Sequence, residues 1–176
     1  KVDGVLASGV CSGRLRATTD IQDAVSSTDM SWICVGTPST PEGGLETHFV
    51  KRVAENIGEA LKGKDGYHLV VLRSTVLPGT VDGVLIPALE AASGKKAYAD
   101  FGVCFHPEFL REGSSVDDFR NPPKTVIGSD DRRSAGTLAA LDSDFDAPLF
   151  KTTTRAAEMV KYADNAFHAL KVVFGN

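Results

Sequence analysis

Several absences in the 176-residue sequence exclude classes of protein. No apolar run approaches the roughly 20 residues of a membrane-spanning helix, so no membrane partner is expected. The net charge of -4 gives no reason to expect a nucleic acid partner. The cysteines Cys11, Cys34 and Cys104 lack C-x-x-C and zinc-ligand spacings, so no metal site is expected. Because Cys34 and Cys104 lie within apolar runs, we expect both to be buried, inert thiols of a protein in the reducing cytoplasm.

A further absence concerns the fold. Short β-rich runs alternate with stretches of helical spacing, which is typical of an α/β protein whose parallel sheet is covered by helices on both faces. Strands are expected at residues 31–35, 68–73, 101–105, 125–128 and 148–151, and helices at 47–61, 78–92, 130–141 and from Thr154 onward. A nucleotide-binding sheet normally begins with a strand, a G-x-G-x-x-G turn and a helix, and no such turn occurs here. Either the chain is not a dinucleotide-binding fold, or its first βαβ unit is missing.

Polar clusters follow three of the expected strands, at residues 36–38, 74–75 and 106–108. In open α/β sheets, ligands bind beyond the carboxyl ends of the strands. Glycine, threonine and proline at a strand end are also ordinary turn residues, but their recurrence after three strands favours a binding edge. Backbone amides and threonine hydroxyls there are suited to hydrogen bonds with a ribose or a phosphate.

The third cluster continues into a segment with two carboxylates, Glu108 and Glu112. If residues 109–112 form a helical turn, the two side chains lie near one another on one side of it. Paired carboxylates suit general-base work or the orientation of a catalytic water. The alternative is a solvated pair that flanks Arg111, and the sequence leaves both interpretations open.

The last expected helix carries an unusual polar stripe. At about 100° per residue, Lys161, Asn165 and His168 fall on one narrow stripe. A solvated face usually carries several charges of both signs, whereas this stripe offers donors suited to an oxyanion and to sugar hydroxyls. Asn176 comes near the same flank if the helix extends that far. The opposite stripe is apolar, and we expect it to pack against the core: Val160, Ala163, Phe167, Leu170 and Phe174.

Taken together, these segments resemble the UDP-glucose/GDP-mannose 6-dehydrogenase family. The matching text lies at residues 35–38, 73–80, 107–112, 123–128 and 158–165, in an order and spacing that match nearly the whole chain. The resemblance implies a Rossmann-like, doubly wound NAD-binding domain without its first βαβ unit at residues 1–150. It implies the start of a central linker and dimerisation helix at 151–176. The text at 77–80 and from Asn165 onward is more similar to GDP-mannose members than to UDP-glucose members.

The resemblance also implies an activity and the residues that serve it. The activity is a four-electron, NAD-dependent oxidation of a sugar nucleotide at C6, from GDP-mannose to GDP-mannuronate, through a thiohemiacetal and a thioester on a cysteine. By position, NAD would be contacted by Gly36, Thr37, Ser74 and Thr75. The sugar nucleotide would be contacted by Glu112, Lys161, Asn165, His168 and Asn176. The catalytic residues would be Glu108, Glu112, Lys161 and Asn165, with the glutamates in proton transfer and thioester hydrolysis and Lys161 at the developing oxyanion.

Two departures from the family pattern bear on these expectations. His106 stands where the family usually has asparagine before Pro-Glu-Phe. The family's nucleophilic cysteine lies in a second domain beyond Asn176, and none of the three cysteines matches it. The chain alone is therefore expected to be inactive, as part of an enzyme that forms a homodimer or a larger homo-oligomer.

Three alternatives remain open at this point. A UDP-glucose 6-dehydrogenase would perform the same chemistry on a different sugar nucleotide. A β-hydroxyacid dehydrogenase shares a Rossmann domain followed by a helix with lysine and asparagine, but it needs no carboxylates for thioester hydrolysis. In a non-catalytic module the long helix would be a subunit interface, and Lys161→Ala would weaken association while leaving oxidation unaffected.

Overall fold

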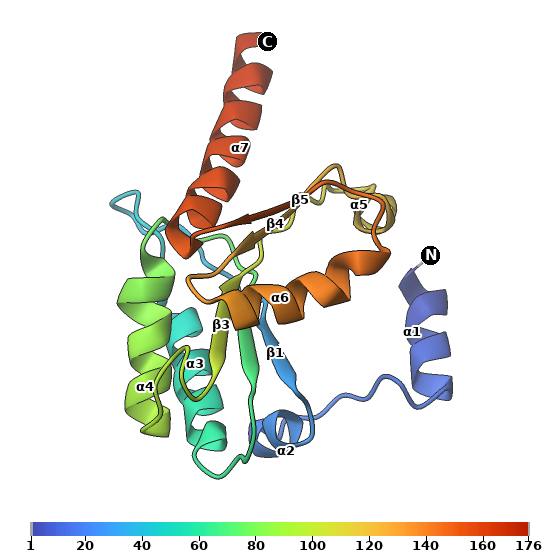
Figure 1. Cartoon of the computed structure of the whole chain (residues 1–176). Helices are drawn as coiled ribbons and strands as arrows, with labels where there is room; N and C mark the ends of the chain where they lie inside the picture. The colour runs from blue at the N-terminus through green and yellow to red at the C-terminus, as the bar shows by residue number, and fades with distance from the viewer. Residues whose placement is uncertain (1, 176) are drawn as a thin grey trace.

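The computed structural model describes residues 2–175, which form one sheet with helices on both faces (Figure 1). The five strands lie side by side in chain order: β1 Met30–Ile33, β2 Leu69–Leu72, β3 Gly102–Phe105, β4 Thr125–Gly128 and β5 Leu149–Thr152. The helices are α1 Val2–Cys11, α2 Ile21–Ser26, α3 His48–Leu61, α4 Ile86–Ser93, α5 Ser115–Arg120, α6 Arg132–Leu141 and α7 Thr154–Gly175. A π-helical turn, Val81–Leu85, leads into α4, and a 3-10 turn, Asp142–Asp144, follows α6. All five predicted strands and all four predicted helices are therefore confirmed, with small shifts at their ends.

The burial of β2 and β3 accounts for the continuous apolar runs from which these strands were predicted. Every residue of β2 and β3 is buried, as expected for strands covered on both faces. On one face, the stripe of α3 that includes Val50, Ala54 and Ile57 packs into the larger part of the core together with α4. On the other face, Leu138 of α6 packs in a second cluster with Cys104 of β3 and Ile127 of β4.

One strand direction differs from the prediction. β1, β2 and β3 are parallel, and β4 and β5 are parallel to each other, but β4 runs antiparallel to β3. Parallel neighbours require a crossover that carries the chain back along the sheet, usually a helix. The chain between β3 and β4 contains only the six-residue α5, so β4 starts at the edge where β3 ends. The predicted parallel sheet is therefore confirmed except at this one junction, where β4 is antiparallel to β3.

The ends of two helices follow the usual capping preferences, an aspartate at the start of α6 and a glycine at the end of α4. The side chain of Asp131 accepts a hydrogen bond from the backbone N of Ser134 at 2.8 Å and caps the start of α6. α4 ends at Gly94, whose φ of 69° lies in the left-handed region that favours glycine. The predicted end of this helix at residue 92 is therefore confirmed to within one residue.

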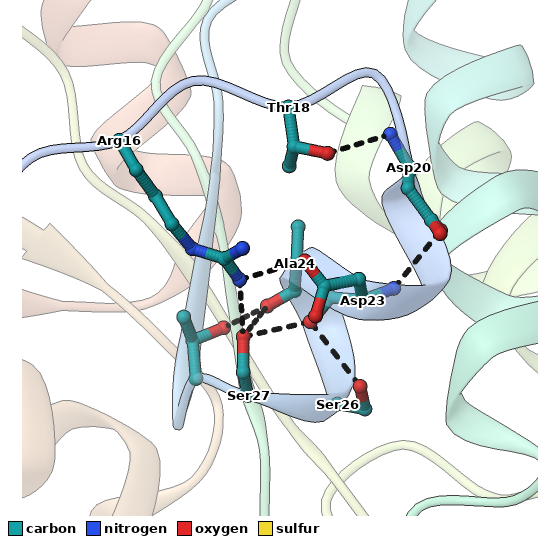
Figure 2. Close-up of polar contacts among 8 residues, drawn as sticks. Arg16, Thr18, Asp20, Asp23, Ala24, Ser26 and Ser27 are labelled. Atoms are coloured by element: carbon teal, nitrogen blue, oxygen red, sulfur yellow. Dashed lines mark hydrogen bonds and ion pairs between the residues drawn. The ribbon is translucent and has the colours of Figure 1, made fainter.

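Two short helices near the N-terminal end were not predicted. Figure 2 shows the polar contacts that surround α2. Asp20 caps the helix by accepting from Asp23 N at 3.0 Å, and Arg16 approaches Asp23 at 2.7 Å and Ser27 at 3.2 Å. These groups are exposed, and exposed ion pairs contribute little to stability. α2 is anchored to the core mainly through Val25, which is buried.

The expectation for the apolar stripe of α7 was wrong. Val160, Phe167, Leu170 and Phe174 are all exposed. The buried positions of α7 lie in its first two turns, at Thr154, Ala157, Glu158 and Lys161. Figure 1 shows why: the helix touches the sheet only at its beginning and then rises away from the body. Within the described residues, 2–175, no helix combines the length and apolar character needed to cross a membrane.

The two cysteines predicted to be buried have different environments. Cys104 is buried within β3, and burial raises the pKa of its thiol to about 12, as expected for an inert thiol. Cys34 is exposed, because β1 ends at Ile33 and lies at the edge of the sheet. The prediction of a buried Cys34 was therefore wrong.

Gly128 sets how closely α7 approaches the sheet. A Cβ at this position would lie 2.5 Å from the Cβ of Ala157 and 3.0 Å from the Cα of Thr154. We therefore expect Gly128→Ala to lower the free energy of unfolding by about 1–3 kcal/mol, the usual cost of overpacking. Gly136→Ala on α6 is the control, because a Cβ there meets nothing within 4 Å. It should be neutral or slightly stabilising in urea unfolding, and an equal loss in both variants would contradict the packing argument.

Candidate functional site

The three predicted polar clusters meet at one edge of the sheet. Ile33, Leu72 and Phe105 are in register at the ends of β1, β2 and β3, so the segments that follow them emerge together. Direct contacts join the first two clusters. The hydroxyl of Thr37 donates to Thr75 O at 2.7 Å, and the hydroxyl of Ser74 donates to Val35 O at 2.6 Å.

The edge presents different groups to solvent. Ser74 is buried and its hydroxyl is committed to Val35 O, so this side chain holds the two loops together. Gly36 is exposed, and open space lies where a Cβ would be, so a ligand can approach its backbone closely. Thr75 is half-buried, and within residues 2–175 its hydroxyl has no hydrogen bond. Gly36 and Thr75 therefore fit the ribose or phosphate of a dinucleotide, whereas the hydroxyl of Thr37, like that of Ser74, already donates to a backbone carbonyl.

Lys161 and Glu108 form the charged centre of the site. Lys161 is only 4% exposed, and its Nζ donates to the backbone O of Glu108 at 2.5 Å and to Oε1 of the same residue at 3.0 Å. Glu108 lies just beyond the end of β3, whereas Lys161 lies two turns into α7. The pair therefore joins the sheet edge to the long helix, and it places a cation beside the strand ends.

A cleft of about 540 Å³ opens next to this pair. The predicted stripe of α7 lines one side of it with Lys161, Asn165 and His168. The opposite wall comes from residues 109–111 and from the chain that follows α5. The structure therefore brings these three predicted residues together in one cleft, with Asn165 and His168 exposed in its wall. Asn176 lies outside the described residues.

Glu112 does not join the other predicted residues. It is exposed, and it lines neither this cleft nor the small pocket that adjoins Glu108. The helical turn that would have brought the two glutamates together does not form. Instead, Leu110 N donates to Glu108 Oε2 at 2.6 Å, and Arg111 N donates to Asp118 Oδ2 at 2.9 Å. These carboxylates engage the backbone groups, and the loop follows a non-helical path.

Two ion pairs in the cleft wall were not predicted. Lys124 Nζ lies 2.8 Å from Asp164 Oδ1 and 4.2 Å from the ring centre of Phe109. Arg111 approaches Asp118 at 2.7 Å, and this contact lowers the pKa of Asp118. The spacing on α7 could have revealed Asp164, which lies three residues after Lys161. No local pattern could have revealed Lys124, because it precedes β4 and its partner on α7 is 40 residues further along the chain.

A polar strand edge, a buried lysine and a polar cleft are typical of one class, an α/β protein that binds a nucleotide at the carboxyl ends of its strands. Among residues 2–175, no three histidine, cysteine, aspartate or glutamate side chains gather as a group suited to a metal ion.

Comparisons with known proteins agree with this class. The model of the NAD-binding domain of the UDP-glucose/GDP-mannose dehydrogenase family matches residues 1–146. GDP-mannose 6-dehydrogenase from Azotobacter vinelandii is 50% identical over 172 residues, which are 98% of this chain and 39% of that protein. UDP-glucose 6-dehydrogenase from Haloferax volcanii is 43% identical over 168 residues, 93% of this chain and 39% of that protein.

The fold comparison leads to the same family. The crystal structure of a ternary complex of GDP-mannose dehydrogenase from Pseudomonas aeruginosa superposes with a TM-score of 0.96 at 47% identity, over 97% of this chain and 39% of that chain. The chain belongs to the UDP-glucose/GDP-mannose dehydrogenase family, and its residues 1–146 match the NAD-binding domain of that family. It spans about two fifths of the length of these relatives.

Proposed function

We propose that this chain supplies the NAD-binding edge and the oxyanion-stabilising lysine of a GDP-mannose 6-dehydrogenase. The observation that carries the proposal is the Lys161 ammonium, which is buried where the strand edge meets the cleft of about 540 Å³. A fixed positive charge is most useful where negative charge develops during the reaction. Oxidation of an alcohol places that charge on the oxygen attached to C6.

The remaining residues of the cleft take roles that fit their chemistry. Asn165 and His168 provide donors and acceptors for sugar hydroxyls, and Glu108 holds Lys161 in place while its carboxylate is available to a proton or a water. NAD held along the strand edge would supply the oxidant, taking one hydride from C6 in each of two successive oxidations with release of protons, and water would supply the second carboxylate oxygen. Glu112 keeps a role in this proposal only if substrate draws its loop toward the cleft.

The cofactor would lie along the strand edge. Gly36, Thr37 and Thr75 would contact NAD there, and Ser74 would act indirectly through the loop that it ties. We also propose that residues 151–176 begin a central helix that links domains and forms part of a homodimer or a larger homo-oligomer. The exposed apolar stripe of α7 supports this interface. Both reactants are nucleotides, so the reaction is proposed to occur in the cytoplasm.

The test uses the protein expressed from the whole reading frame that contains this chain, completed with the segments of the Azotobacter vinelandii relative wherever that frame is shorter. This protein is called the complete enzyme below. We expect it to form two NADH for each GDP-mannose consumed, since an alcohol becomes a carboxylate in two oxidations. Absorbance of NADH, with quantified GDP-mannuronate, measures this ratio.

UDP-glucose is the second substrate to assay, since the Haloferax volcanii relative that is 43% identical carries that name. A preference for UDP-glucose would retain the chemistry and overturn the substrate. One NADH per sugar would instead favour a simple alcohol oxidation of the hydroxyacid type. A folded complete enzyme that binds NAD and oxidises neither sugar nucleotide would contradict the proposed function.

A further inference from the structure

Three polar side chains from different elements meet behind the loop that carries Glu108. His106 follows β3 and is 5% exposed. Its Nε2 lies 2.8 Å from Asp142 Oδ2, in the turn after α6, and its Nδ1 lies 2.5 Å from NH1 of Arg73, just beyond β2. The ring is also 5.2 Å from that of Trp32 in an edge-to-face arrangement.

The partners of His106 define its protonation pattern. A guanidinium group only donates hydrogen bonds, so Nδ1 must accept from Arg73. The hydrogen of the neutral ring then lies on Nε2, which donates to the carboxylate of Asp142. Asp142 is also buried, so the link between them is protected from water. One ring thus bridges a cation just beyond β2 and an anion in the turn after α6.

His106 is separated from Glu108 only by Pro107. Proline fixes its own φ, and Pro107 is buried, so little freedom remains between the anchored ring and the glutamate. The backbone O and Oε1 of Glu108 are the two acceptors that hold Lys161 Nζ. The position of the His106 ring therefore restricts where Glu108 can lie, and through Glu108 it restricts the position of Lys161 Nζ.

We propose that Arg73, His106 and Asp142 are positioning residues that fix Glu108 against Lys161. Their effect on the reaction rests on the proposed function, whereas their effect on the geometry of Lys161 does not. The asparagine usual in the family would reproduce only half of the bridge. Its Oδ1 takes the place of Nδ1 and accepts from Arg73, but none of its atoms reaches the place of Nε2 beside Asp142.

Two substitutions separate the halves of the bridge. His106→Asn keeps the acceptor for Arg73 and loses the donor to Asp142. His106→Gln places an amide nitrogen near Asp142 and loses the acceptor for Arg73. His48→Asn is the matched control, because His48 is exposed and outside the site. Circular dichroism and thermal unfolding establish that each variant of the complete enzyme is folded.

The first measurement is the rate at which an amine-reactive ester labels Lys161, read by mass spectrometry in the complete enzyme. We expect labelling to rise about fivefold in both His106 variants, because a lost hydrogen bond shifts a local equilibrium by roughly that factor. Lys171, which is exposed on α7, should be labelled equally in all variants. Unchanged labelling of Lys161 in both folded variants would overturn the proposal.

The second measurement separates kcat from KM. Loosened positioning should lower kcat about fivefold to tenfold and leave the KM for the sugar nucleotide within about twofold, since misplacement acts mainly on the reacting geometry. Faster labelling of Lys161 in a protein that oxidises no sugar nucleotide would support the positioning role and refute the proposed function. Full kcat with unchanged labelling would refute the positioning role alone.

Discussion

Replacing Lys161 by methionine is expected to lower kcat of the complete enzyme by about 10²–10³, the usual loss when one donor to a developing oxyanion is removed. Methionine keeps the apolar stem of the side chain but removes the ammonium that lies 2.5 Å from Glu108 O and 3.0 Å from Oε1. The fold should tolerate the change, because the Glu108 side chain is 29% exposed and water can take the place of the lost partner. The KM for the sugar nucleotide should change much less than kcat.

Lys171→Met is the matched control for this experiment. It makes the same substitution on the same helix, at an exposed lysine whose Nζ lies 5.2 Å from the ring centre of Phe167 and outside the cleft. NADH formation measures kcat and KM, and sedimentation measures the oligomeric state. A Lys161→Met protein that keeps its kcat but dissociates into smaller units would support the non-catalytic interface. Equal losses in both variants would point to damage to α7 as a whole.

The edge of the sheet was predictable because local patterns determine it. A buried strand reads as an apolar run, and parallel strands bring their carboxyl ends together, so residues 36–38, 74–75 and 106–108 could be placed at one site. The stripe that contains Lys161, Asn165 and His168 was predictable for a similar reason, since helical spacing alone groups them. The specific roles of those residues toward the sugar nucleotide came from the resemblance to a family, not from the spacing.

The sequence did not determine which face of α7 is covered. Periodicity separates an apolar stripe from a polar one, but the covered stripe depends on where the helix meets the sheet. Gly128 admits the first turns of α7 at Ala157, and this contact places Lys161 inward while Phe167 remains exposed. The direction of β4 was hidden likewise, because it depends on the path of a loop and not on the composition of the strand.

The loop around Glu112 shows how long-range polar contacts override a local pattern. The spacing of Glu108 and Glu112 suited a helical turn, but Asp118, on α5, accepts from both the backbone and the guanidinium of Arg111. A hydrogen bond across seven residues is invisible to a pattern that compares positions four apart. The bridge from His106 to Asp142 spans 36 residues and was hidden for the same reason.

Glu158→Ala is expected to cause the largest loss of stability among the site variants, about 2–4 kcal/mol, because each buried N–H without a partner costs about 1–3 kcal/mol. Glu158 is fully buried in the second turn of α7. Its two carboxylate oxygens accept from Gly79 N at 2.5 Å and from Val81 N at 2.9 Å. These amides open the helical segment that leads into α4, where N–H groups lack partners within the helix. Glu158 thus fastens α7 to the body just before Lys161.

Urea unfolding of the chain measures this loss, and Glu59→Ala on the exposed face of α3 is the control, with little change expected.

The pH dependence of stability gives a second test. Burial raises the pKa of Glu158 above its usual value of 4.5, so the folded state binds this proton more tightly than the unfolded state. The stability that this tighter proton binding contributes is fully present below pH 4.5 and is lost as the pH rises through the raised pKa. The glutamine of Glu158→Gln cannot titrate. The free energy of unfolding of this variant should therefore lie further below that of the native chain at pH 4.5 than at a pH above the raised pKa. A difference that grows as the pH rises would contradict the raised pKa.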